Sequence, residues 1–305
     1  MATSSKRNTD CKVRSNSFPR RSLPSTLRIE EELKRLKAWE AGSSVPTVDT
    51  ICNGLSGVEE LYKCVDDLLG LPLAQQALSH HQGEDLADEL LDGSVRLLDI
   101  CGAARDFMSQ LKEHVCDLQS ALRRRSGDLS IESSFAKYTS FRRKMKKECS
   151  RLIAALKELD CKVGGSPLLD HDDHLQVFIR VLWEVSSRAI FVFQSLLRFF
   201  SLPVSKAKPT KWSMVSKLMH KGAVTCEERK NYVHEFESAD AALCRLCRYG
   251  SSEGEKMQIS QSKLEVLEAG IDGFENRLRS IFRRLVKARA SLLNVISNKY
   301  YFQNS

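Results

Sequence analysis

The most apolar run in the chain covers residues 175–200, LQVFIRVLWEVSSRAIFVFQSLLRFF. Three of its four charges, Arg180, Glu184 and Arg188, are four residues apart and form one stripe on a helix, while apolar side chains fill most of the remaining circumference. A helix that is apolar on nearly all sides is buried on most of them. Its longest charge-free piece, residues 189–197, is far shorter than the about 20 residues that span a bilayer. The pattern predicts the central helix of a soluble helical bundle.

Long segments on both sides of this run carry apolar residues at alternating steps of three and four, the spacing of helices packed lengthwise. The clearest seams lie within residues 48–69, 84–125 and 264–295. The forty-odd residues of the second of these predict a rod of roughly 60 Å. Weaker patterns predict helices at 25–42, 128–161 and 225–249, and residues 70–83 read as a short polar joint.

No alternation typical of a strand occurs in the sequence, so the predicted fold class is all-α. The expected architecture is a bundle of long antiparallel helices with coiled-coil-like heptad packing, preceded by a disordered N-terminal tail at residues 1–24. The main helical part covers residues 25–200, and a Pro/Lys/Ser linker at 201–211 leads to a C-terminal helical part, 212–305, that packs on the same bundle. The predicted core is led by six residues, Leu97, Leu111, Trp183, Phe191, Leu278 and Leu285.

The formal net charge is +8, and most of it lies at the start of the chain. Residues 1–29 contain seven Lys or Arg and one acid, Asp10, for a charge of +6. The near-neutral remainder argues against a nucleic-acid-binding protein. With no apolar signal-like segment at its start, the chain is expected to be cytoplasmic, although a Ser/Arg-rich, acid-poor start also fits a transit peptide to a plastid.

Five segments stand in an order that identifies a family: RSNSFP at 14–19, LPLAQQALSHH at 71–81, ELLDGSVRLLDICGAARD at 89–106, LRRRSGDLS at 122–130 and IFRRLVKARASLLNVIS at 281–297. Together they resemble a plant-specific family related to the BYPASS proteins, and the resemblance covers nearly the whole chain. It implies a role in root and shoot development. The family has no established catalytic activity, so the resemblance supplies no active-site residues.

We therefore expect a non-enzymatic regulatory or scaffold protein that acts through protein–protein contacts. The alternative is a peripheral membrane or anionic-ligand binding helical protein. An enzyme remains the weakest hypothesis, because the chain has no Gly-rich phosphate loop, GxSxG or HExxH motif.

Two clusters have the residue types of a metal or redox site. Cys244 and Cys247 form a CxxC pair, but the βαβ setting of a redox motif is missing, and a zinc site needs two more ligands. Their helical spacing favours a role in the core. His171 and His174 flank two acids at a helix start, where acids are favoured in any case. No metal, cofactor or catalytic residue is therefore expected.

Basic stripes are better candidates for binding. Two helices carry three cations each at steps of four, and like charges at this spacing repel by a few tenths of a kcal/mol per pair. An acidic protein, a phosphate group or an anionic membrane surface would relieve this repulsion, whereas the alternative is a solvated face. The stripes are Arg143, Lys147 and Arg151 on the fourth long helix, and Arg279, Arg283 and Lys287 on the last.

The tail contains a short phosphorylation motif of the form R-S-x-S-x-P, made by Arg14, Ser15, Ser17 and Pro19. A phosphate on Ser17 would add a charge of about −1.5 to −2 to a basic segment. Clustered arginines of a 14-3-3-type protein recognise such phosphopeptides, so this partner is expected for the phosphorylated tail. Chance occurrence in a Ser/Arg-rich segment is the alternative.

Overall fold

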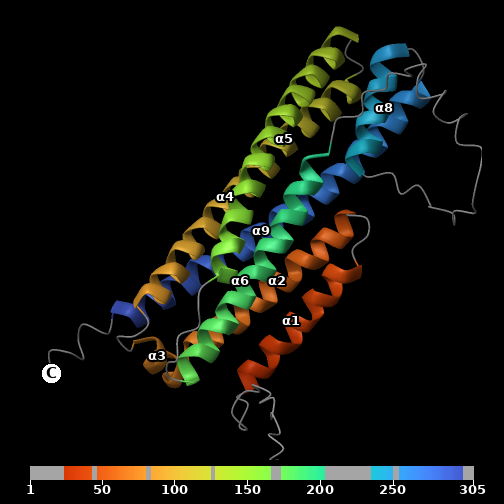
Figure 1. Cartoon of the computed structure of the whole chain (residues 1–305). Coiled ribbons are helices and arrows are strands. Elements are labelled where there is room, and N and C mark those ends of the chain that lie inside the picture. The colour runs from red at the N-terminus through yellow and green to blue at the C-terminus, as the bar shows by residue number, and fades with distance from the viewer. Residues whose placement is uncertain are drawn as a thin grey trace, which may run out of the picture.

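A computed structural model describes residues 24–42, 47–79, 84–124, 128–165, 173–202, 235–249 and 254–297. Nearly all of these residues are helical and none forms a strand, so the all-α prediction is confirmed. The long helices lie side by side along one axis (Figure 1). They are α1 (Pro24–Gly42), α2 (Val48–Leu69), α3 (Pro72–Ser79), α4 (Glu84–Arg123), α5 (Asp128–Gly165), α6 (Asp173–Phe200), α8 (Glu235–Tyr249) and α9 (Gly254–Ser297).

Helix α6 lies in the middle of the bundle, as its composition predicts. It packs against α1, α2, α3, α4 and α5, because apolar side chains cover most of its circumference. Trp183 is buried, as are Leu97, Leu111, Leu278 and Leu285 on the neighbouring helices. The prediction is wrong for Phe191, which is only half-buried. Its ring makes an edge-on contact with that of Trp39 on α1, with centroids 6.0 Å apart.

Helix α9 joins the two halves of the chain by packing between α2 and α4. It is antiparallel to α4, because Lys112 pairs with Asp272 while Arg289, later in α9, donates to the carbonyl of Leu91, earlier in α4. It is parallel to α2, since both helices advance together from the Val48–Gly270 contact to the ion pair of Asp66 and Arg284. The prediction of antiparallel helices is therefore right for α9 and α4 but wrong for α9 and α2, which are parallel neighbours.

The heptad seams mark the buried faces correctly. Every position of the α9 seam from Leu264 to Val295 is buried, and so is the α2 seam from Ile51 to Leu69. Helix α2 begins at an N-cap, where the hydroxyl of Thr47 accepts a hydrogen bond from the Thr50 amide at 3.2 Å. The expected polar joint is wrong in part, because α3 forms within it. Its first residue is Pro72, and proline is preorganised for that helical position.

Helix α1 approaches α2 closely at two glycines. A Cβ atom on Gly57 would lie 2.6 Å from Leu36, and one on Gly54 would lie 2.7 Å from the indole of Trp39. The indole Nε1 also donates to the carbonyl of Thr50 at 2.8 Å. The absence of side chains at these two glycines thus allows Leu36 and Trp39 of α1 to pack directly against the backbone of α2.

Replacing Gly57 with alanine should lower the free energy of unfolding by about 1–3 kcal/mol, because the added methyl overpacks against Leu36. Gly93→Ala is the matched control, since its Cβ would meet only Leu159 at an ordinary 3.6 Å. That change should stabilise the helix by up to about 1 kcal/mol. Urea denaturation measures both effects, and equal stabilities for the two variants would contradict the close contact.

A buried polar cluster joins α5, α6 and α8. The side chains of Arg142 and Asp240 are 1% and 0% exposed, and their nearest charged atoms are 3.7 Å apart. The hydroxyl of Tyr138 donates to Asp240 at 2.8 Å. The guanidinium of Arg142 also lies over the ring of Phe236, 4.0 Å from its centroid. The cluster therefore ties α8 to α5 through charge, hydrogen bonding and an aromatic contact.

The same guanidinium satisfies the end of the central helix. The last carbonyls of an α-helix have no partner within the helix and carry its negative dipole end. Arg142 donates to the carbonyl of Phe200 at 3.1 Å and to that of Leu202 at 3.3 Å. Phe236, which lies against this guanidinium, belongs to a group of four phenylalanines joined by edge-on ring contacts: Phe199, Phe200, Phe236 and Phe274.

Truncating Arg142 to alanine should lower the free energy of unfolding by about 3–5 kcal/mol, because Asp240 and the carbonyls of Phe200 and Leu202 would lose a buried cation. The neighbouring residue provides the control. Arg143 is exposed, and Arg143→Ala should change stability by no more than about 0.5 kcal/mol. Equal midpoints for the two variants in a urea titration would show that the cluster does not hold α6 and α8.

Candidate anion-binding surface

Helix α5 carries a long stretch of cations without an acid. Between Glu132 and Glu148 the sequence has six Lys or Arg residues and no Asp or Glu. One of them, Arg142, points into the core. The other five are exposed and cover the outward half of the helix, and we call them the α5 basic face: Lys137, Arg143, Lys144, Lys146 and Lys147.

No ion pair neutralises the α5 basic face within the part of the chain that the structure describes, although the hydrogen bond from Arg151 and, to a smaller extent, the charge of Lys147 lower the pKa of the neighbouring Glu148 carboxyl. None of its five side chains forms an ion pair or a hydrogen bond with a described residue. Arg143 and Lys147 are four residues apart, so they stand one above the other on the helix. Their charges are left to solvent or to a partner.

The third residue of the predicted α5 stripe behaves differently. Arg151 donates to Glu148 through its Nε at 2.9 Å. The hydrogen bond from Arg151 lowers the pKa of the Glu148 carboxyl. Arg151 is therefore neutralised by its own helix, and the unpaired region ends at Lys147.

The predicted stripe on α9 is largely neutralised within the protein. Arg279 donates to Glu275 at 2.8 Å, and the ammonium of Lys287 lies 3.3 Å from Asp66 of α2. Arg283 is exposed and has no partner among the described residues. The two predicted stripes are thus not equivalent, because α9 has acids beside it and the middle of α5 does not.

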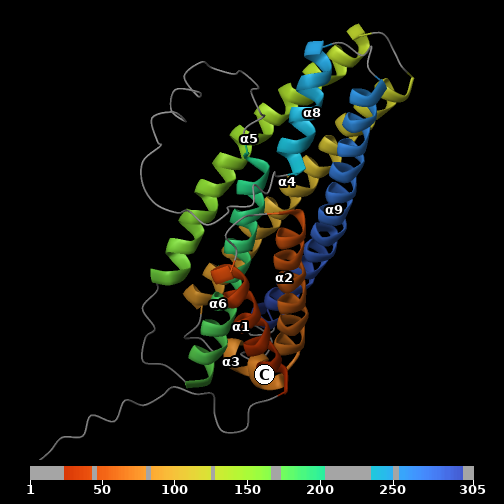
Figure 2. The same ribbon diagram turned by 90° about the vertical axis from the view of Figure 1, so that its right-hand side faces the viewer.

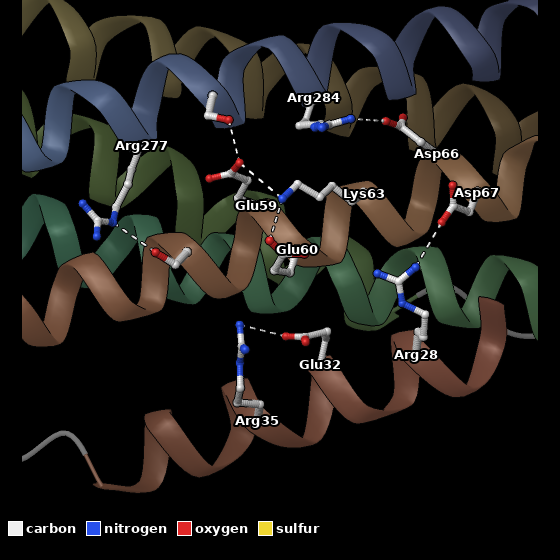
Figure 3. A network of polar contacts seen from close by, with 12 residues as sticks. Arg28, Glu32, Arg35, Glu59, Glu60, Lys63, Asp66, Asp67, Arg277 and Arg284 are labelled. Carbon is white, nitrogen blue, oxygen red and sulfur yellow. Dashed lines mark hydrogen bonds and ion pairs between the residues drawn. The ribbon is translucent and has the colours of Figure 1, made fainter. Parts of the chain in front are cut away.

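A network of polar contacts at the border of α2 and α9 explains this difference (Figure 3). Glu59 of α2 accepts a hydrogen bond from Ser280 at 2.7 Å. Further along both helices, Asp66 pairs with Arg284 at 3.3 Å, and its side chain is only 4% exposed. Earlier along both helices, Arg277 donates to the hydroxyl of Ser56 at 3.0 Å. Asp66 of α2 therefore meets the α9 cations Arg284 and Lys287 across the interface of the two helices.

The remaining candidates can be placed only in part. The phosphorylation motif at residues 14–19 lies outside the described residues, as does His171. Cys244 and Cys247 are half-buried on α8, and Cys247 packs against the hydrophobic core. Among the described residues, no three His, Cys, Asp or Glu side chains gather as metal ligands would. No described helix is both long enough and apolar enough to cross a membrane.

Sequence reasoning missed two features of this region. Lys144 and Lys146 extend the basic face on either side of the predicted stripe, and the acid-free run from 133 to 147 was the signal that could have found them. Arg142 was also missed, although it continues the seam of Tyr138, Met145 and Cys149 at steps of three and four. A cation in a seam position signals a buried charge with a partner elsewhere in the fold.

The chain matches the family model described as Protein BPS1 over residues 54–295. It belongs to that family. The match confirms the resemblance to BYPASS-related proteins, and it spans α5, the buried Arg142 cluster and nearly all of α9. No curated protein matches the chain, and no solved structure matches it.

The cysteines provide a test of how the family core is packed. Burial raises the pKa of Cys101 and that of Cys149 to about 12, and both side chains are inaccessible. Cys161, near the end of α5, is exposed. Because the thiolate is the reactive form, iodoacetamide at pH 8 should modify Cys161 within minutes and the other two only after unfolding. Peptide mapping measures this, and rapid native labelling of Cys149 would contradict the packing around the end of α6.

Proposed function

We propose that the chain is a non-enzymatic regulatory or scaffold protein of plant root and shoot development that acts through protein–protein contacts. Its docking surface for an acidic partner protein is the α5 basic face. Membership in the Protein BPS1 family supports the developmental setting through the resemblance to BYPASS-related proteins. One observation carries the docking surface: five exposed cations stand on α5 without an ion pair to any carboxylate among the described residues.

The electrostatic reason is the repulsion that α5 retains. Cations one turn apart on a helix destabilise it by a few tenths of a kcal/mol per pair. Helix α9 relieves this with Glu275 and with Asp66 of α2. On α5, carboxylates or phosphates of a partner would relieve the repulsion between the cations by forming charge-assisted hydrogen bonds with them.

The geometry of α5 favours a specific contact over a loose one. The side of the helix opposite the basic face is held by Tyr138, Arg142 and Cys149, all buried. A rigid helix presents its cations at fixed spacing, which reduces the ordering cost of binding. Arg143 adds a planar fork that binds a carboxylate through two parallel hydrogen bonds. A partner segment with acids at helical spacing fits this surface.

The tail motif at Arg14–Pro19 supplies a second and separate contact in this proposal. Phosphorylated Ser17 would bind a 14-3-3-type protein, which reads phosphate beside arginine. Because the motif precedes α1, its loss removes a phosphorylation-dependent partner and leaves the α5 contact intact.

A second candidate function is binding to an anionic membrane surface. The observation that favours it is Leu129, which is 83% exposed at the start of α5. Clusters of four to eight basic residues on a helix are typical of anionic-lipid binding, and an exposed apolar side chain strengthens the attachment. The lipid phosphates would then take the place of the partner protein's acids.

The test replaces Arg143, Lys144 and Lys147 with glutamine. The control replaces Lys34, Arg245 and Lys263, which are also exposed but lie on three other helices, so the change in net charge is equal. Tagged proteins are recovered from plant tissue at low and high salt. At low salt, the α5 variant should recover about tenfold less of the partner proteins that wild type and control retain. This difference in recovery should shrink at high salt, because exposed charges are screened.

Vesicles separate the two candidate functions. Phosphatidylcholine vesicles with and without phosphatidylserine are floated with each protein. Flotation that needs phosphatidylserine, α5 cations and Leu129 supports the membrane candidate. Partner proteins that depend on the α5 cations, without flotation, support the docking proposal. Equal partner recovery for wild type and the α5 variant at every salt concentration would overturn it, provided thermal denaturation shows that the variant is folded.

A further inference from the structure

Helix α9 presents apolar side chains to solvent on the side away from its buried seam. Seven large apolar side chains in the described part of the chain are at least 40% exposed, and four of them lie on this one helix: Ile259, Val266, Val286 and Leu293. They form two pairs with seven-residue spacing. In Figure 2, α9 runs down the right of the view, while α5 slants from the top toward the left edge and away from α9, so this surface is separate from the α5 basic face.

The exposed residues of α9 are arranged symmetrically about Asn276. Ile259 and Leu293 each lie seventeen residues from Asn276, and Val266 and Val286 each lie ten residues from it. An acid and a base follow the same rule, because Glu265 and Lys287 are both eleven residues away. All six residues and Asn276 are exposed.

We infer that the outer face of α9 is a homodimer interface, in which two copies of the chain pack their α9 helices antiparallel about a two-fold axis at Asn276. This places Ile259 against Leu293 of the second copy and Val266 against its Val286. It also places Glu265 against Lys287 of the second copy. The same patch thus serves both subunits, which is the requirement for a closed two-fold dimer.

The sides of the helix agree with this packing. In a frame of 3.5 residues per turn, Ile259 and Val266 fall about 50° to one side of Asn276, and Val286 and Leu293 about 50° to the other. When two helices pack lengthwise, each layer of the interface holds one residue from one side of the first helix and one from the other side of the second. In the antiparallel arrangement both of these residues are apolar. A parallel arrangement would instead face Lys287 with Lys287 and Glu265 with Glu265.

The centre of the face permits close approach. Ser262, Ala269 and Ala290 are small and exposed, and they lie on the same line as Asn276. Arg283 is on this line too, and it faces Ala269 of the second copy, one turn from that copy's Glu265. The dimer therefore gives an acidic neighbour to Arg283, which has none among the described residues of its own chain. From Ile259 to Leu293 the contact runs about 50 Å, long enough for an interface of about 1,200–2,000 Å².

The first test is the mass in solution by light scattering. The molar mass of the wild-type protein should be about twice the 34.5 kDa of one chain. Val266→Glu combined with Val286→Glu should give the monomer mass, since each charge enters the interface twice. Leu129→Glu is the control, because it charges an exposed apolar residue on α5 and should leave the dimer intact. A wild-type monomer at every concentration, or a dimer that persists in the double variant, would overturn the interface.

The second test fixes the direction of the helices. Under mild oxidation Asn276→Cys should form a disulfide-linked dimer, because this residue meets its own copy at the axis. Val266→Cys alone should not, because the two substituted positions are about 30 Å apart. Val266→Cys with Val286→Cys should link again. Peptide mapping against wild type identifies the linked residues and separates them from native cysteines. Linkage through position 266 alone would reject the antiparallel arrangement.

Discussion

The burial of α6 is the constraint on which the rest of the structure depends. A helix that is apolar on nearly every side has to be covered on nearly every side, and five other helices do this. The burial creates a second requirement at its end, because the carbonyls of Phe200 and Leu202 need a donor from the protein. Arg142 meets it, and Asp240 of α8 lies beside the guanidinium. One apolar run thus determines the core and also the place where α8 docks.

The treatment of charge follows from the same packing. Where two helices share a long interface, cations at its border find acids across it, as Arg284 and Lys287 do with Asp66. Helix α5 packs with its inner side and presents its other half outward, so its exposed cations have no such neighbour among the described residues. The α5 basic face and the outer face of α9 are then separate surfaces on a rigid frame. One offers charge to an acidic partner, and the other offers a self-complementary pattern to a second copy.

Much of this could be predicted from the sequence because the periodicity of a helix is local. Seams at steps of three and four located α2, α4 and α9 and most of the residues they bury, and the apolar composition of residues 175–200 located α6. The acid-free run on α5 can be read directly from the order of its residues. The failures have physical causes. Helix α3 is short and starts at a proline, so it has too few apolar repeats for a helical pattern to be recognised in the sequence. Phe191 is apolar but lies at the edge where α1 meets α6. Arg142 is a cation in a seam position, which is tolerated only because a carboxylate, the last carbonyl of α6 and the carbonyl of Leu202 meet it there.

The sequence by itself determined that the chain is helical, where the long helices lie and which side of each is buried, since these depend on residues within a few turns of one another. Only the tertiary structure decided which helices are neighbours: that α9 runs parallel to α2 and antiparallel to α4, and that α8 packs on α9 and touches α5 at the Arg142 cluster. Those choices decide which charges meet. Arg143 and Lys287 look alike in the sequence, yet one is left without an acid among the described residues and the other lies beside Asp66. A seam specifies that a face must be covered, but not by which partner, because any helix with a complementary apolar stripe satisfies it.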